Sequence, residues 1–172
     1  MRKLCLLALV AAAPMFAGDG NTASTSATAS VNLYAPIVLT KVSDVNFGVY
    51  VFDGKAVTLQ MAQDGTVSGG NKFSGQQLAH DLTTSKAGAF QWSKDANLNV
   101  DIKVNDQLLA ATTNTLAAMK LGDDKVLWTI KADKDETNPS LGKLTLYGDL
   151  AIADGAATKS YTGTFTVNVA YN

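Results

Sequence analysis

The side chains that could perform chemistry are few in this sequence. His80 is the only histidine and Cys5 the only cysteine among the 172 residues. A catalytic nucleophile needs an adjacent base, and the sequence has no lipase-type elbow, phosphate-binding loop or zinc-protease motif. One histidine and one cysteine also exclude a zinc site built from several of them. The sequence therefore predicts no catalytic residue, no enzyme and no cofactor, and we interpret His80 as a surface or hydrogen-bonded residue.

Several side chains with oxygen atoms that can bind a metal ion lie close together in the sequence at 133–138. Asp133, Asp135 and Glu136 are followed closely by Asn138, and hard oxygen ligands at such spacing can hold a calcium ion. The stretch lacks the glycine and the closing glutamate of an EF-hand loop, and Pro139 interrupts it. We therefore interpret the cluster first as a solvated acidic loop, with a calcium site as the alternative.

Two further groupings carry alternative functions. An enzyme would need convergent carboxylates, for instance from Asp133, Asp135 and Asp149, but their separation in the strand pattern does not favour a common cleft. Trp92 and Trp128 form a sugar-binding platform if both are exposed on one face of the molecule. Each lies in an alternating strand, which favours a place in the core.

The elements that hold these residues follow the period of two that is typical of strands. Turn signals interrupt the pattern, among them Asp64-Gly65 and Asn105-Asp106. About eight to ten short strands with no amphipathic helix favour an all-β fold, a single antiparallel β-sandwich of Ig-like, Greek-key or jelly-roll kind. Residues 112–121 fit either a short helix or a meandering strand, and 132–140 reads as a polar excursion. The expected strands lie at 37–40, 45–49, 57–61, 90–92, 98–104, 126–131, 144–152 and 160–172.

The last of these strands has the strongest pattern. Residues 161–172 read Y-T-G-T-F-T-V-N-V-A-Y-N, with threonines and asparagine on one parity and apolar residues on the other. Such a strand has one face for the core and one for water. The sequence predicts inward packing and strand pairing for Tyr161, Phe165, Val167, Val169 and Tyr171.

Composition and charge narrow the class of protein. Hydrophobic residues make up 47% and charged residues 17% of the chain, which suits one domain with a real core. The formal net charge of -1 provides no field for nucleic acid or an anionic membrane. The sequence therefore predicts no nucleic-acid partner.

The start of the chain resembles a secretory signal peptide. Arg2 and Lys3 precede a short apolar run, Leu4 to Ala13, and cleavage is expected after Ala17. A retained membrane anchor is the alternative, but the run is too short to span ~30 Å of hydrocarbon as a helix. No later segment is apolar enough to cross a membrane.

Cleavage would leave a chain with distinct properties. Removal of residues 1–17 takes away the only arginine and the only cysteine, so the net charge becomes -3 and no disulfide can form. The expected organisation is a signal peptide at 1–17, a flexible leader or N-terminal strand at 18–30, and a β-sandwich domain at 31–172. The expected location is the periplasm, the outer surface, a fimbrium or the extracellular space.

Both ends of the expected domain resemble a known bacterial family. Residues 31–48, V-N-L-Y-A-P-I-V-L-T-K-V-S-D-V-N-F-G, resemble the opening of the family called domain of unknown function 4402. Residues 64–70 resemble its next turn, and 161–172 resemble its closing strand, while 71–135 depart in detail. The resemblance implies an exported Ig-like sandwich and no particular reaction.

The closing strand is also similar to that of chaperone–usher fimbrial subunits, which alternate apolar residues and carry a tyrosine just before the last residue. Such subunits accept a strand from a chaperone or from the next subunit, with main-chain hydrogen bonds supplying the affinity. In this sequence residues 22–33 could serve as the donor. The resemblance implies a structural or adhesive surface protein, with a periplasmic chaperone or other subunits as partners.

Two alternatives stay open beside the fimbrial subunit. The first is a secreted or periplasmic module that binds a glycan or another ligand. The second is a monomeric exported protein of unknown role, in which both terminal strands complete one molecule.

Overall fold

The computed structural model describes residues 25–69, 72–73, 76–77, 80–81, 84–110 and 112–172. The expected signal peptide and the first part of the leader lie outside these residues. The chain divides into two units, Met1–Leu33 and Tyr34–Asn172. In the first unit, residues 25–33 carry no helix or strand and are exposed.

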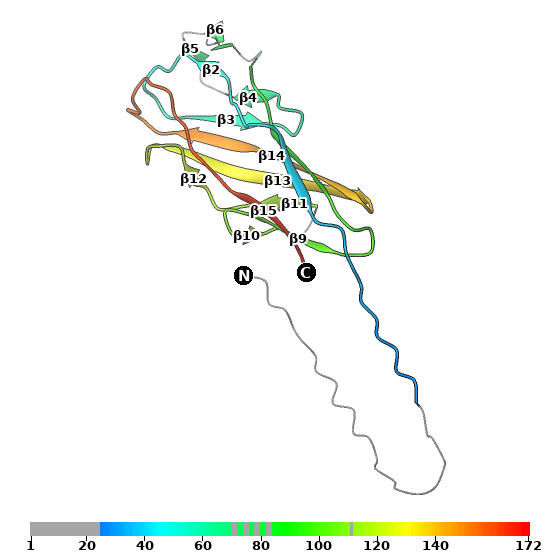
Figure 1. Ribbon diagram of the computed structural model, residues 1–172. Helices are drawn as coiled ribbons and strands as arrows, with labels where there is room; N and C mark the ends of the chain where they lie inside the picture. The colour runs from blue at the N-terminus through cyan, green and yellow to red at the C-terminus, as the bar shows by residue number, and fades with distance from the viewer. Residues whose placement is uncertain (1–24, 70–71, 74–75, 78–79, 82–83, 111) are drawn as a thin grey trace, which may run out of the picture. The chain divides into compact units, whose positions relative to one another are not determined.

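The second unit is built from strands, and its described residues contain no helix (Figure 1). The strands are β1 (Val38–Ser43), β2 (Val49–Tyr50), β3 (Val57–Met61), β4 (Val67–Gly69), β5 (Lys72–Phe73), β6 (Gln76–Gln77), β7 (His80–Asp81), β8 (Gly88–Ser93), β9 (Val100–Val104), β10 (Gln107–Leu108), β11 (Thr113–Thr115), β12 (Met119–Lys120), β13 (Val126–Asn138), β14 (Leu141–Ile152) and β15 (Val167–Tyr171).

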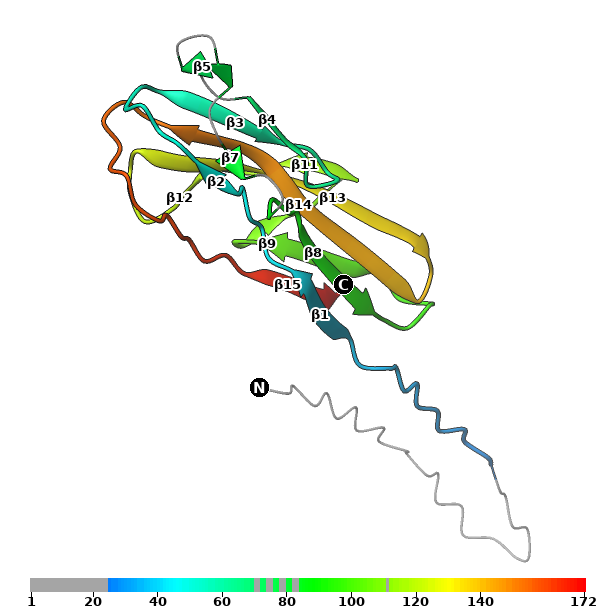
Figure 2. The same cartoon turned by 90° about the horizontal axis from the view of Figure 1, so that it is seen from above.

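Two antiparallel sheets carry the core. The large sheet runs β1-β8-β14-β13-β11, with β12 beside β13 and with β3 and β4 continuing from β14. The small sheet has the order β10-β9-β15, and Figure 2 shows it lying across the large one. The predicted all-β, antiparallel sandwich is confirmed.

The hairpin of β13 and β14 is the spine of the large sheet. The two strands pair with each other over nearly their whole length. On its other edge, β14 pairs first with β8 and then with β3. Gly148 opens the β3-paired part of β14 with a φ of 128°, where a Cβ would collide with the Thr129 carbonyl oxygen. A glycine is needed there because other residues rarely adopt this backbone conformation.

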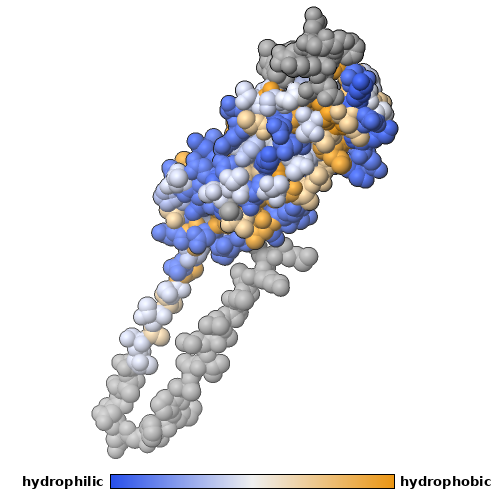
Figure 3. Space-filling model, turned by 180° about the vertical axis from the view of Figure 1, so that it is seen from behind, coloured by the Kyte–Doolittle hydropathy of each residue, from blue (hydrophilic) through white to orange (hydrophobic). Residues whose placement is uncertain are grey.

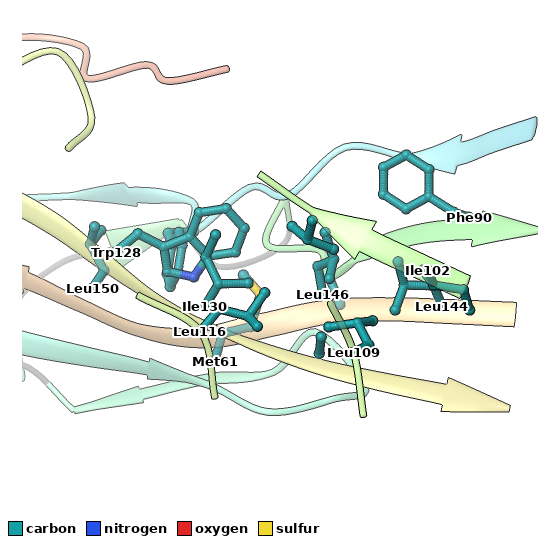
Figure 4. Packing of buried hydrophobic residues seen from close by; sticks show 14 of the residues in the cluster. Met61, Phe90, Ile102, Leu109, Leu116, Trp128, Ile130, Leu144, Leu146 and Leu150 are labelled. Carbon is teal, nitrogen blue, oxygen red and sulfur yellow. The ribbon is translucent and has the colours of Figure 1, made fainter. Parts of the chain in front are cut away.

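The core consists of the apolar side chains at every second position of these strands. Val126, Trp128 and Ile130 of β13 are almost fully buried, as are Leu144 and Leu146 of β14. Figure 4 shows Ile102 of the small sheet close to Leu144 and Leu146, and Trp128 close to Leu150. The alternation that the sequence displays thus separates core from surface along each long strand.

Several local predictions are confirmed. Asn105 and Asp106 have positive φ angles of 47° and 63° and join β9 to β10 in a two-residue hairpin. Gly65 also has a positive φ, 86°, in the turn that links β3 to β4. Residues 112–121 form the short strands β11 and β12, so the meandering-strand interpretation is correct.

Several predicted strand extents were wrong. The strand expected at 45–49 is an isolated bridge at Asn46 followed by β2. The expected polar excursion at 132–140 is mostly strand, because β13 continues to Asn138 and pairs with β14. The polar side chains of this part of β13 point away from the core or lie near the hairpin turn. The sequence there therefore lacks the apolar alternation by which the other strands were predicted. The closing strand begins at Val167, not near Ser160, because the preceding residues cross from the large sheet to the small one.

Candidate functional site

Two segments from opposite ends of the domain run antiparallel along one side of the sandwich. Residues 35–54 include β1, the edge strand of the large sheet, and residues 155–171 include β15, an edge strand of the small sheet. We call the space between them the seam. β1 pairs with β8 and β15 pairs with β9, so neither strand pairs with the other across the seam.

Hydrogen bonds close the seam at its two ends. At one end the Tyr171 hydroxyl donates to the carbonyl oxygen of Ala35 at 2.7 Å and accepts from the Asp95 amide at 2.8 Å. At the other end the Gly155 amide donates to the Gly54 carbonyl oxygen at 2.9 Å. The tyrosine thus ties the closing strand to the beginning of the domain.

Aromatic rings anchor both sides of the seam to its floor. Phe47 from one side and Phe165 from the other each meet Trp128 edge-on, with ring centroids 6.2 and 5.6 Å apart. Phe165 also meets Phe90 edge-on at 6.0 Å. Such edge-to-face pairs are favourable beyond the area they bury.

Between the anchors lies a cleft of about 490 Å³. Its sides come from residues 45–52 and 157–165, and its floor from β13 and β14 together with Leu121. Aromatic side chains contribute much of the lining, and most of the exposed lining surface is apolar. The aromatic residues are Phe47, Tyr50, Phe52, Trp128, Tyr161 and Phe165.

Burial in this cleft changes the acidity of one side chain. Desolvation raises the pKa of Tyr50 to about 12. The low-dielectric surroundings disfavour the phenolate, so the group stays neutral throughout the physiological range. The cleft wall is therefore uncharged at Tyr50, and Lys159 sits at the rim with its Nζ 5.2 Å from the centroid of the Tyr161 ring.

The side of the seam formed by residues 157–165 has an unusual main chain. Within the described part of the protein, no main-chain hydrogen bond joins these residues to another segment. All of them are exposed apart from the half-buried Tyr161 and Phe165. Within the stretch, the Ala157 carbonyl oxygen accepts a hydrogen bond from the Tyr161 hydroxyl at 2.7 Å. An exposed main chain without strand pairing resembles a sheet edge, where a further strand can add.

The free edge continues into β15. Thr166 accepts a hydrogen bond from the Asn105 amide and the Asn172 amide donates to Asn99, so the even-numbered residues face β9. Because antiparallel ladders alternate, the main-chain groups of Val167, Val169 and Tyr171 point away from β9. The seam is thus bordered by main chain that pairs with no other strand among the described residues.

Exposed apolar side chains of the described residues concentrate near the start of the domain. Figure 3 shows apolar surface, in orange, breaking through the polar surface of the domain. Most of the large apolar residues that are exposed lie between positions 31 and 51. They are Val31, Leu33, Tyr34, Val38, Leu39, Val42, Val49 and Val51.

The five residues predicted to pair and pack at the end of the chain all belong to the seam. Tyr161 and Phe165 precede β15 and line the cleft, while Val167, Val169 and Tyr171 lie in the strand. All five are half-buried and pack against the core, and the intervening residues are exposed. The inward parity is the one predicted, but the strand pairing predicted for Tyr161 and Phe165 is wrong, because only Val167, Val169 and Tyr171 lie in the paired strand.

The acidic residues proposed as calcium ligands lie on β13, not in a loop. Asp133 accepts hydrogen bonds from Gln63 and Thr113, and Glu136 pairs with Lys134 at 3.0 Å. Asp135 accepts hydrogen bonds from the main-chain amide and the hydroxyl of Thr137. The hydrogen bond from the amide is the main reason that the pKa of Asp135 is lowered. Among the described residues, no three acidic, histidine or cysteine side chains form a group able to hold a metal ion.

The other proposed groupings are also separated. Asp149 forms an ion pair with Lys131 at 3.1 Å and does not share the partners of Asp133 or Asp135. Trp92 and Trp128 are each only 2% exposed, so they form no surface platform. The Trp92 indole lies over Gly142 of the neighbouring strand, where any Cβ would overlap it. The His80 backbone pairs with Tyr50 in β2, and its side chain lies outside the description.

The chain matches a known protein family. The family model described as Domain of unknown function (DUF4402) matches residues 37–171. The chain belongs to this family. The match runs from the residue before β1 to Tyr171, so it contains almost the whole length of both sides of the seam. No curated protein and no solved structure matches the chain.

One side of the seam was missed by the sequence analysis. Residues 45–52, V-N-F-G-V-Y-V-F, form a cleft wall, although part of this stretch was predicted only as a core strand. The sequence does contain a sign of this wall: residues 45–52 include more large apolar side chains than one half-buried strand can place in the core.

Among the described residues, no helix is long and apolar enough to cross a membrane.

Proposed function

We propose that this chain is an exported, non-enzymatic structural or adhesive surface protein that assembles by adding a strand from one copy to the next, as a fimbrial subunit does. The observation that carries the proposal is the seam, where two edges of the sandwich run side by side without pairing. An incomplete sandwich of this kind gains main-chain hydrogen bonds when a further strand enters.

The leader has the properties of a donor. Its apolar residues Ala27, Ala29, Val31 and Leu33 share one parity, and small polar residues occupy the other. Val31 is 78% exposed and Leu33 is 87% exposed. A segment that alternates like a strand but has no strand partner is suited to pairing with another molecule.

Export is part of the same proposal. The signal-peptide-like start would direct the chain across the inner membrane, and the remaining chain contains no cysteine. A domain without disulfides depends on strand pairing and core burial for its stability. Completion of the seam by a partner would therefore stabilise the subunit as well as link it.

The proposal can be tested by removing the donor. Protein starting at residue 18 is compared with protein starting at residue 34 by size-exclusion chromatography and negative-stain microscopy. We expect multimers or fibres from the first and monomers from the second. A matched control replaces 18–33 with a Gly/Ser sequence of equal length, and we expect it to behave as the truncation does.

A strictly monomeric particle from the longer protein at high concentration, with stability unchanged by the truncation, would refute strand donation. Multimers that persist in the Gly/Ser control would show that assembly uses another surface.

A further inference from the structure

We infer that the cleft in the seam receives Val31 and Leu33 of a second copy, with the leader of that copy paired to the main chain of residues 157–165. This inference rests on the proposed function, and it specifies which surface accepts the donor and which side chains anchor it. Neither the family description nor the resemblance to fimbrial subunits assigns these residues.

The two sides of the seam differ in how far their main chain is already hydrogen-bonded. Residues 157–165 are largely exposed and have no main-chain hydrogen bond to another described segment, whereas on the other side Asn46 bonds to Lys86 and β2 pairs with β7. An incoming strand therefore meets fewer existing main-chain hydrogen bonds on the 157–165 side.

The lining of the cleft suits aliphatic side chains. Trp128 contributes an apolar side chain to the floor, and Phe47, Phe165 and the neutral Tyr50 contribute to the walls. Branched aliphatic side chains bind such surfaces by removing apolar area from water on both partners. In an extended strand Val31 and Leu33 stand roughly 7 Å apart on one face, so both can reach one elongated cleft.

The other free edge is less suited to the donor. The outer parity of β1 includes Lys41, which lies opposite Phe90 and forms an exposed ion pair with Asp44. A bulge between Lys41 and Ser43 also interrupts the regular spacing of that strand. Charged side chains and bulges are features that discourage pairing at a sheet edge. The segment 157–165 carries one charge, Lys159, whose ammonium group stands over the Tyr161 ring.

Site-specific cross-linking between copies tests the inference. In a Cys5→Ser background, a tagged Leu33→Cys chain is mixed with an untagged Ser160→Cys chain and oxidised. Ser160 is exposed and lines the cleft. We expect a mixed disulfide dimer, identified by mass and tag. The matched control replaces Ser160→Cys with Leu108→Cys, which is exposed on β10 outside the cleft, and we expect no mixed dimer above background.

A second readout measures the anchor itself. Leu33→Ala removes an aliphatic side chain that association would bury, so we expect association to weaken roughly ten- to a hundredfold. Asn32→Ala, on the opposite parity of the leader, should change association little.

Three results overturn the inference, and they are distinguishable. Multimers without preferential cross-linking at Ser160 place the donor elsewhere and leave the proposed function intact. A disulfide that forms only inside a Leu33→Cys, Ser160→Cys double variant makes the chain's own leader the occupant. Monomers throughout refute both the inference and the proposed function.

Discussion

The two halves of the inner face of the large sheet are covered in different ways. The half at Leu144 and Leu146 lies under the small sheet, and both side chains are at most 1% exposed. The half at Leu150 and Ile152 borders the cleft, beneath two segments that do not pair with each other, and Ile152 is only partly buried. A paired strand therefore excludes water from this face of the sheet, while the two unpaired segments leave a cleft beside it.

The largest expected effect comes from placing a charge where the seam is anchored. Phe165→Asp removes a ring that meets Trp128 and Phe90 and leaves a carboxylate without a partner among apolar groups. We expect a loss of about 4 kcal/mol in the free energy of unfolding, measured by urea denaturation, or no folded protein. The neighbouring, exposed Thr164→Asp should change stability by less than about 0.5 kcal/mol. Similar stabilities for the two variants would show that this parity does not face the core.

Truncation of one side chain in each half tests the comparison directly. Leu146→Ala should cost about 3 kcal/mol in unfolding free energy because the packed surroundings leave a cavity. Ile152→Ala should cost about 1 kcal/mol in unfolding free energy because its side chain already borders the open cleft. Equal losses in urea denaturation would contradict the difference between the covered and open halves.

The tie at the end of the seam should contribute less. Tyr171→Phe removes the hydrogen bond to Ala35 and leaves the partly buried Asp95 amide without its acceptor. We expect a loss of about 1 to 2 kcal/mol in unfolding free energy and faster proteolysis near Ala35. Tyr34→Phe, at an exposed residue, is the control and should be neutral; an equally neutral Tyr171→Phe would show that the tie is unimportant.

The smallest effect is a pH dependence. Burial raises the pKa of Tyr50 from 10.0 to about 12, so the folded protein holds this proton more tightly than the unfolded chain does. The contribution is complete below pH 10 and is lost as the pH rises from 10 to about 12. In Tyr50→Phe the fall in unfolding free energy over this interval should be smaller than in the parent protein. An identical pH profile would show that the hydroxyl is solvated.

Much of the sandwich could be predicted because alternation reports burial locally. The residues of β3, β9 and β14 show a period of two, and each strand buries the expected parity. The extension of β13 to Asn138 escaped notice because Lys134, Asp135 and Glu136 break the apolar pattern while the main chain still pairs. Strand pairing depends on backbone neighbours, which side-chain patterns reveal only indirectly.

The site was harder to predict than the fold. The parity of Phe165 and Tyr171 was readable from the sequence, because aromatic residues between threonines indicate an inward face. The cleft was not readable, because it depends on residues 45–52 and 157–165 meeting over β13 without pairing. The sequence of either segment alone does not determine how close the two segments lie in the folded protein.

Hydrogen–deuterium exchange of the main-chain amides in residues 157–165 measures whether the seam is open and whether a second copy closes it. In protein lacking residues 18–33 we expect these amides to exchange as fast as exposed loops, while β13 and β14 stay protected. In assembled protein with the leader present, we expect protection of 157–165 to approach that of the paired strands. Rapid exchange at 157–165 in both proteins, or strong protection in both, would contradict an open seam that a second copy completes.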